Sequence, residues 1–485
     1  MIDLSLVAVL LFLAEVLLAL VTAIYVSANR KPSSAIAWVL AVIFIPVIGI
    51  LFFLLVGAGR LPKHRRDKQR AVTTTIQEKT EGGLDELAER RDWPDWLPSI
   101  VTLNWNLGAL PMVGGNTAEL LDDYVGAIDA MIADIDRATD YVHVEFFILV
   151  HDDTTKPFFD ALARACRRGV TVRVLSDHLA QYSYPNRKQT LQVLAEMGAE
   201  YRPMLPLQPL QGHWRRPDLR NHRKLVVVDG VIGHTGSLNM ITDSYHKKAN
   251  VAKGLHWHEL MVRLRGPVVR ALDAVFVTDW YSETQDLLPL DYRPVVLSEE
   301  PGHLDGQVVP SGPSFDNDNN LKLFAAVIQN ARRRISITSP YFVPDETIQM
   351  ALVTAGSRGL DVELFVSEIG DQFMVFHAQR SYYEQLLRAG VKIYLYRAPT
   401  VLHAKHLSID DDVAIIGSSN MDIRSLSLHM ELMVLVQGAD FVTDLRTVED
   451  DYRSKSRQVV LEDWLRRPRT EKAFDNLMRM TSALM

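Results

Sequence analysis

The chain has 485 residues, which is too long for one compact core and predicts two globular units with a smaller additional segment. Its 52 basic and 59 acidic residues give a net charge of -7, which disfavours nucleic acid as the main partner and leaves room only for a local basic site. The single cysteine, Cys166, excludes an internal disulfide bond and fits a protein that faces the cytosol.

Two long apolar runs lie within the first sixty residues, from Leu4 to Val26 and from Ile36 to Val56. A helix of 23 residues extends about 35 Å, enough to cross a hydrocarbon core of about 30 Å, so residues 1–59 are predicted to form a two-helix transmembrane hairpin. A cleaved signal peptide is the alternative for the first run, but the run is too long and lacks a charged leader. Pro46 and Gly49 are tolerated in membrane helices, so their presence does not argue against the second span.

A basic segment follows the second apolar run and predicts the orientation of the hairpin. Only Arg30 and Lys31 lie between the runs, so the positive-inside rule places the end after Val56 in the cytoplasm. The segment is either a solvated stop signal or an attractor of anionic headgroups, and residues 60–103 are predicted to be a juxtamembrane segment and linker. Its basic residues are Arg60, Lys63, Arg65, Arg66, Lys68 and Arg70.

Helix and strand patterns then alternate in two similar series, which predicts an α/β fold with a mixed or parallel sheet. The first series opens with a helix over 119–137 and a strand over 141–149, and the second with a helix over 321–333 and a strand over 335–339. Gly169 and Gly359 each end a helix before an apolar strand, so the chain contains an internal duplication.

The duplication gives the predicted domains and what joins them. The halves are residues 104–288 and 321–470, and residues 289–320, rich in Pro, Gly, Asp and Asn, form the connection. The tail, residues 471–485, carries an apolar helical stripe that either docks on the protein or lies on a bilayer. The stripe consists of Phe474, Leu477, Met478, Met480 and Leu484.

One motif occurs in both halves, and Lys follows His by two positions, Asp by seven and Asn by seventeen. Because a strand alternates faces with period two, the His and Lys of each copy should project to the same side. A packed core has no use for a Lys beside a His, so two copies in register predict one shared reactive site. The copies consist of His222, Lys224, Asp229, Ser237 and Asn239, and of His403, Lys405, Asp410, Ser418 and Asn420.

These residues resemble the phospholipase D superfamily, whose signature H-x-K-x4-D followed by G-[GS]-x-N is present twice in two-domain members. The segments Arg30-Lys31-Pro32 and Gly266-Pro267-Val268-Val269 further resemble bacterial cardiolipin synthases. The resemblance implies two duplicated phospholipase D-like α/β/α sandwich halves that share one active site and follow the transmembrane hairpin. It also implies transfer of a phosphatidyl group between two phosphatidylglycerol molecules at a bacterial inner membrane, with the catalytic region facing the cytoplasm.

The chemistry of phosphodiester cleavage explains why these residue types recur. One neutral imidazole attacks phosphorus, and a second, protonated imidazole supplies the departing alcohol with a proton, so two histidines with different protonation states are needed. The resemblance implies that His222 forms a phosphohistidine and that His403 is the general acid and base. Charge neutralisation and hydrogen bonds to the phosphoryl oxygens are assigned to Lys224, Lys405, Asn239 and Asn420.

Three further pairs complete the predicted site. Glu259 and Glu431 follow the two motifs where the family has its His-pairing acids, and Ser237 and Ser418 are assigned to substrate binding. Asp229 and Asp410 are too far along their strands to share the site, so we expect them to cap the hairpin turns. A metal cluster is the competing interpretation, but Lys is cationic and makes H-x-K a poor ligand set, so neither a metal nor a cofactor is expected.

Several functional alternatives stay open at this stage. Water instead of a second lipid would make the protein a phospholipase D-type hydrolase, whereas the acidic balance argues against a nuclease and the intact motifs against a scaffold. The chain also departs from the family pattern at Gly236-Ser237, at Glu259 and at Leu426, His429 and Met430, which affects the expected choice of substrate rather than the catalytic groups. Phosphatidylglycerol, the bilayer and a second copy of the chain are the expected partners.

Overall fold

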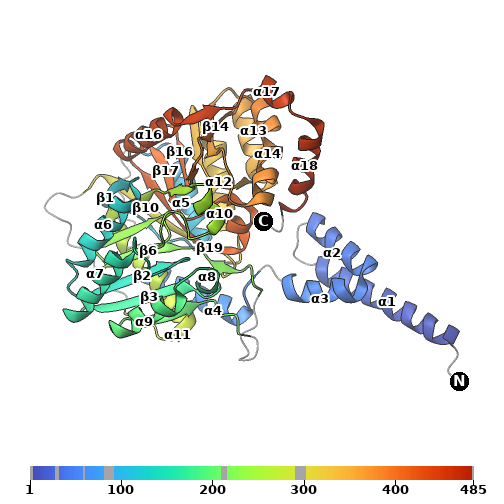
Figure 1. Ribbon diagram of the computed structural model, residues 1–485, viewed down its shortest axis with the longest axis horizontal. Helices are drawn as coiled ribbons and strands as arrows, with labels where there is room; N and C mark the ends of the chain where they lie inside the picture. Colours follow the sequence, from blue (N-terminus) through green and yellow to red (C-terminus); the bar gives the residue numbers. More distant parts are fainter. Residues whose placement is uncertain are drawn as a thin grey trace.

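The computed structural model describes residues 4–27, 32–57, 60–80, 92–208, 216–289 and 302–482. Over these residues a sixteen-stranded sheet runs through the main body of the molecule and is covered by helices (Figure 1). The fold is therefore mixed α/β, as the alternating patterns predicted.

The strands form two series with the same spatial order, which meet at the antiparallel pair β1 and β10. The first series is β4 (Glu200–Met204), β3 (Thr171–Asp177), β2 (Tyr141–Phe146), β6 (Lys224–Val228), β7 (Ile232–Gly236), β9 (Met261–Arg265) and β1 (Met112–Leu121). The second is β14 (Lys392–Tyr396), β13 (Asp361–Ser367), β11 (Arg334–Thr338), β16 (His406–Ile409), β17 (Val413–Gly417), β19 (His429–Gln437) and β10 (Leu304–Ser311), with β20 (Ser456–Gln458) outside β14.

Helices connect the strands in the same order in both series. The first series has α6 (Tyr124–Ile135), α7 (Lys156–Arg167), α9 (Arg187–Glu196) and α11 (Val268–Thr284), and the second has α12 (Asn319–Asn330), α13 (Glu346–Ser357), α14 (Phe373–Arg388) and α16 (Ala439–Ser454). Gly169 and Gly359 follow α7 and α13 with φ of 86° and 85°, a left-handed conformation that glycine adopts without strain. The predicted helix ends are confirmed at both positions.

A shared hydrophobic core joins the two series. It combines side chains of α11 and β9 with side chains of β10, β19 and α16. Strands β6 and β17 are buried along their whole length, which explains why they read as continuous apolar runs rather than as alternating ones. The two series therefore pack as one body.

Two boundaries differ from the predicted ones. Residues 119–121 belong to β1 and pair with β9, so the helix predicted from residue 119 begins at Tyr124 as α6. The predicted connection contains β10, which pairs with both β1 and β19 at the centre of the sheet. Residues 290–301 of that connection lie outside the described residues. Both segments are strands because they pair with strands distant in sequence, and such pairing cannot be read from local composition.

The amino-terminal segment forms three helices, α1 (Leu4–Ser27), α2 (Pro32–Phe44) and α3 (Pro46–Val56), which stand to one side of the sheet (Figure 1). The second predicted span is wrong as a single helix, because the chain breaks at Ile45, with φ -138° and ψ 66°. Pro46 lacks an amide hydrogen and its ring disfavours a helical conformation in the preceding residue. Across the described part of the chain, none of the helices combines the length and the apolar character that crossing a membrane takes.

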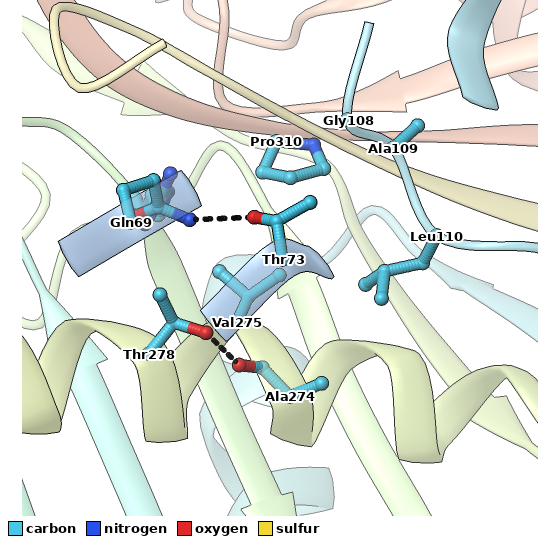
Figure 2. A pocket seen from close by; sticks show the side chains of 10 residues that line it. Gln69, Thr73, Gly108, Ala109, Leu110, Ala274, Val275, Thr278 and Pro310 are labelled. Atoms are coloured by element: carbon cyan, nitrogen blue, oxygen red, sulfur yellow. Dashed lines mark hydrogen bonds between the residues drawn. The ribbon is translucent and has the colours of Figure 1, made fainter. Parts of the chain in front are cut away.

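The basic segment is a helix, α4 (Lys63–Thr80), that packs against α11. Arg65 donates two hydrogen bonds, of 2.8 and 2.6 Å, to the carboxylate of Glu283, and both side chains are nearly buried. Figure 2 shows Gln69 and Thr73 of α4 across a solvent-open hollow of about 340 Å³ from Ala274, Val275 and Thr278 of α11. Arg65 is therefore packed against the body of the protein, whereas Arg60 and Arg70 stay more than half exposed.

The carboxyl-terminal helix α18 (Arg469–Arg479) docks on α14, which is the first of the two alternatives for the tail. Asp475 is buried and contacts His377 at 2.8 Å and Arg467 at 2.8 Å. The short helices that remain are α5 (Leu97–Asn106), α8 (Ala180–Ser183), α10 (Lys248–Ala252), α15 (Ile423–Ser427) and α17 (Leu461–Leu465).

Candidate active site

Each motif histidine lies between a short strand that pairs with the opposite series and a strand that pairs within its own series. His222 follows β5 (Arg220–Asn221), which pairs in parallel with β19 of the second series, and precedes β6. His403 follows β15 (Thr400–Leu402), which pairs with β8 (His256–His258) of the first series, and precedes β16. The expectation that each His lies within one strand is therefore corrected, because the strand changes its partner at the His.

Each histidine is held by a carboxylate of the opposite half. Nδ1 of His222 lies 3.0 and 3.1 Å from the two oxygens of Glu431, and Nδ1 of His403 lies 2.8 Å from both oxygens of Glu259. The backbone repeats the exchange, since the amide of His222 donates to the carbonyl oxygen of Met430 at 2.8 Å. With Nδ1 engaged in both rings, Nε2 is the nitrogen that remains for chemistry.

The two serines that precede the motif asparagines support these carboxylates. The Ser418 hydroxyl donates to Oε2 of Glu431 at 2.6 Å and accepts the amide of Leu432 at 2.9 Å. The Ser237 hydroxyl accepts the amide of Leu260 at 2.8 Å, and its hydrogen bond to Glu259 helps to lower the pKa of that carboxyl. Both hydroxyls are buried and turned toward the acids that hold the histidines.

Both motif lysines are buried beside their histidines, and each ammonium donates to the carbonyl oxygen of its own His. Burial lowers the pKa of Lys224 to about 7 and that of Lys405 to about 8, although nearby carboxylates work in the opposite direction. A bound phosphate would restore the charge of both ammonium groups, because an anion favours the protonated form. The site is therefore suited to an anionic group between the two lysines.

The two His–Glu pairs differ in their electrostatics. Burial lowers the pKa of His222 well below its usual range, with Lys224 and Lys405 adding to the effect, and burial raises the pKa of Glu431 to about 8. In the other pair, burial acts to raise the pKa of Glu259, but the interactions with His403 outweigh burial. The pKa of Glu259 is therefore lowered. Burial lowers the pKa of His403 too, but the charged carboxylate of Glu259 opposes that shift, whereas the pKa of His222 lies well below its usual range.

The motif asparagines have different surroundings. Asn239 donates to the hydroxyl of Tyr245 at 3.0 Å, and that hydroxyl donates to Oε1 of Glu259 at 3.0 Å, so Asn239 is linked through Tyr245 to the acid that holds His403. Asn420 is buried, and among the described residues its amide oxygen has no hydrogen-bond partner.

The motif aspartates lie away from the histidines. Asp229 accepts three backbone amides just before β2, from residues 139, 140 and 141, at 2.8 to 2.9 Å. Asp410 accepts the amides of residues 332, 333 and 334 just before β11. Both have positive φ, 52° and 50°, at the hairpin turn. They tie the turn to the neighbouring strand rather than capping the turn itself.

Sequence reasoning did not single out the aromatic side chains that line the site. Phe147 lies edge-on to His222 with ring centroids 5.0 Å apart, and Tyr245 and Tyr341 each lie 6.2 Å from His403. Tyr245 is six residues after Asn239, and nothing in its spacing marks it. These rings limit the access of water to the two imidazoles. Their place in the site follows only from the fold.

A third histidine, His429, stands where the family pattern has another residue. Its ring centroid lies 5.5 Å from that of His222, and ligand atoms of His222, His429 and Glu431 lie within 4.8 Å of one another. Such a group has the donor types of a metal site, but the buried ammonium groups of Lys224 and Lys405 oppose a cation there. The donor set therefore fits an anion between the lysines better than a metal ion.

Comparisons with known proteins find similarity over nearly the whole chain. The family model described as "Cardiolipin synthase, PLD-like domain" matches residues 131–280 and 324–450, one segment in each series of strands, and "Phospholipase_D-nuclease N-terminal" matches residues 16–57. Cardiolipin synthase A of Proteus mirabilis is 30% identical over 467 residues, 94% of both chains. Cardiolipin synthase A of Pectobacterium atrosepticum is 30% identical over 485 residues, 98% of both chains.

A solved structure shares the fold at lower sequence identity. Phosphatidylserine synthase of Haemophilus influenzae superposes with a TM-score of 0.59 at 16% identity, and the match covers 79% of this chain and 99% of that one. At this identity the likeness concerns the fold alone.

Proposed function

The chain belongs to the cardiolipin synthase family and is a phosphatidyltransferase, and we propose that it converts two phosphatidylglycerol molecules into cardiolipin and glycerol through a phosphohistidine on His222. The observation that carries the proposal is the exchange of carboxylates between the halves. It gives each of two imidazoles a fixed Nδ1 partner and leaves both Nε2 atoms for one phosphate.

In the first step, Nε2 of His222 attacks the phosphorus of one phosphatidylglycerol. The bond from phosphorus to the glycerol oxygen breaks, and the imidazolium of His403 gives that oxygen a proton. The neutral state of His222 and the anionic state of Glu259 support this division of roles. Lys224 and Lys405 neutralise the charge on the phosphoryl oxygens, which grows more exposed in the transition state.

In the second step, a hydroxyl oxygen of another phosphatidylglycerol attacks the phosphohistidine. The proton of that hydroxyl passes to His403, the phosphorus–nitrogen bond breaks, and its electron pair returns to His222. Asn420 adds a hydrogen bond to the phosphoryl group. Ser237, Ser418 and Asn239 act through the carboxylates and Tyr245 that they contact.

Water in place of the second lipid would turn the same intermediate into phosphatidic acid, so hydrolysis is the second candidate function. The aromatic rings around both histidines favour transfer, because they limit the access of water. A nucleic acid substrate is disfavoured by the net charge of -7.

The membrane is the proposed location of the reaction. Helices α1 to α3 expose large apolar side chains, among them Phe12 at 64%, Ile24 at 73% and Phe44 at 78%. A contiguous apolar surface of this kind is typical of contact with lipid. We expect helices α1 to α3 to hold the protein at the bacterial inner membrane, with the catalytic halves on the cytoplasmic side; a homodimer is a further expectation.

The test uses the full-length protein in vesicles of phosphatidylglycerol. The wild type should release glycerol and form cardiolipin, and a His222→Ala variant should lose at least about three orders of magnitude in rate. A His403→Ala variant should form the covalent intermediate from phosphatidyl-p-nitrophenol, because p-nitrophenolate leaves without a proton.

Four results would contradict the proposal in different ways. Phosphatidic acid as the dominant product would favour the hydrolase, and the absence of turnover would favour a scaffold. Labelled phosphate trapped on His403 rather than His222 would reverse the two roles. Full activity of the His222→Ala variant would exclude His222 as the nucleophile.

A further inference from the structure

A hollow beside His403 is a feature of the second half that the proposed reaction does not yet use. It has a volume of about 260 Å³, counting the part open to solvent, and lies between the ends of β13 and β15 and the start of α14. Its polar lining comes from Tyr341, Ser367, Asp371, Gln372 and Gln379, and Val401 forms part of the apolar wall.

The duplication explains why the hollow exists. In the first half, the amide of Asn221 donates to Oδ2 of Asp177 at 3.1 Å, and in the second half the amide of Leu402 donates to the hydroxyl of Ser367 at 2.8 Å. Asp177 is the last residue of β3, which pairs in parallel with β2, and Ser367 is the last residue of β13, which pairs in parallel with β11. The sheet register and these two hydrogen bonds make Ser367 the counterpart of Asp177.

The residues that precede Asn221 and Leu402 also differ between the two halves. In the first half the residue is Arg220, which is buried and lies 3.2 Å from Asp177, so an ion pair fills the space beside His222. In the second half it is Val401, and the shorter pair of Val401 and Ser367 leaves the hollow open. The two halves therefore differ beside their histidines, and the open space lies beside His403, the histidine proposed to exchange a proton with the alcohol.

The position of the hollow matches the direction of the reaction. In phosphoryl transfer the entering and leaving groups are in line, so an alcohol must lie on the side of phosphorus opposite His222, where His403 can reach its oxygen. Tyr341 links the hollow to that histidine, because its ring lies 6.2 Å from His403 and its hydroxyl donates to Oδ1 of Asp371 at 2.8 Å.

We propose that this hollow is the polyol subsite of the enzyme, which takes the glycerol headgroup of the acceptor lipid and, in the first step, the departing glycerol, with Asp371 as its specificity-determining residue. The proposal rests on the proposed function. A carboxylate accepts hydrogen bonds from hydroxyl groups and repels a phosphate, so it selects the alcohol end of the substrate. The side chain of Asp371 is 4% exposed, which strengthens each such bond.

The mouth of the hollow suits the remainder of an acceptor phospholipid. Lys247 lies there, 45% exposed, with its ammonium 3.4 Å from Oδ2 of Asp371. A phosphatidylglycerol whose hydroxyls contact Asp371 would carry its own phosphodiester outward, toward the ammonium of Lys247. The transfer is the second step described above: the hydroxyl oxygen bonds to phosphorus, its proton goes to His403, and the bond from phosphorus to His222 breaks.

The first test removes the negative charge of Asp371 and keeps the shape of its side chain. In Asp371→Asn, we expect the KM for glycerol in the reverse reaction, cardiolipin plus glycerol giving phosphatidylglycerol, to rise at least about tenfold, since a charged acceptor is lost. Release of p-nitrophenolate from phosphatidyl-p-nitrophenol into water needs no polyol, so its rate should change much less than the KM for glycerol, and this split between the two readouts reports the subsite. Glu368→Gln is the matched control, because Glu368 is three residues away, pairs with Arg457 and does not line the hollow.

The second test fills the hollow with the side chains of the first half. The double variant Ser367→Asp with Val401→Arg should shift the products from cardiolipin toward phosphatidic acid, because water still reaches the intermediate. Thermal unfolding reports whether this variant folds, and Asp371→Asn carries the test if it does not.

The outcomes separate the subsite from the function on which it rests. If the wild type makes no cardiolipin, the proposed function fails. If the wild type makes cardiolipin while Asp371→Asn keeps both the wild-type KM for glycerol and the wild-type ratio of cardiolipin to phosphatidic acid, the polyol subsite is excluded and the reaction stands.

Discussion

At the scale of single residues, the site depends on pairs that the sequence places far apart. His222 and Glu431 are 209 positions apart, and His403 and Glu259 are 144 apart. Motif spacing was enough to find the histidines and lysines, and the family resemblance pointed to both acids. Neither could assign each acid to the opposite half, because that assignment depends on β5 reaching β19 in space.

The pH dependence of kcat/KM follows from the shifted groups of the free enzyme. Glu431, with a pKa raised by burial to about 8, must lose its proton to accept Nδ1–H of His222, so the rate should rise with pH on the acidic side. Lys224 and Lys405, with pKa values lowered by burial to about 7 and about 8, must keep their protons, so the rate should fall on the alkaline side. We expect a narrow bell with its maximum between about pH 7 and pH 8.

A pH series of initial rates on phosphatidyl-p-nitrophenol checks this expectation. Glu431→Gln should be slower and should lose the acidic limb, while the alkaline limb remains. A flat profile from pH 6 to pH 9 in the wild type would show that neither group titrates in the free site.

At the scale of elements, the motif aspartates stabilise the sheet rather than the chemistry. In Asp229→Ala, three backbone amides before β2 lose their acceptor, and we expect the free energy of unfolding to fall by about 2 kcal/mol. Specific activity measured well below the unfolding temperature should be unchanged, because Asp229 contacts neither histidine. Asp411→Ala, at an exposed position of the other turn, is the control for a harmless loss of charge. A large loss of activity in folded Asp229→Ala would instead place Asp229 in the reaction.

Elements were predictable where local chemistry fixes them and not where distant pairing does. The glycine stops after α7 and α13 and the Asp229-Gly230 turn follow from local backbone preference. Residues 119–121 satisfy a helical pattern equally well, and only β9 turns them into strand. Pro46 was treated as compatible with a membrane helix, yet the chain breaks at Ile45.

At the scale of the whole molecule, neither half contains a complete catalytic pair. A chain cut between Leu288 and Gly302 leaves Glu431 on one fragment and His222 on the other, so we expect each fragment alone to be inactive. Co-expression should restore cardiolipin formation to the extent that β1 and β10 reassociate. Measurable glycerol release by the first fragment alone would contradict the requirement for the opposite carboxylate.

The pairing of each histidine with a carboxylate of the opposite half also determines when the site can form during synthesis of the chain. The ribosome completes His222 and Lys224 about two hundred residues before Glu431 emerges. Until then His222, the proposed nucleophile, lacks the carboxylate that would fix its tautomer, so we expect a nascent chain that ends before Glu431 to be inactive toward lipids.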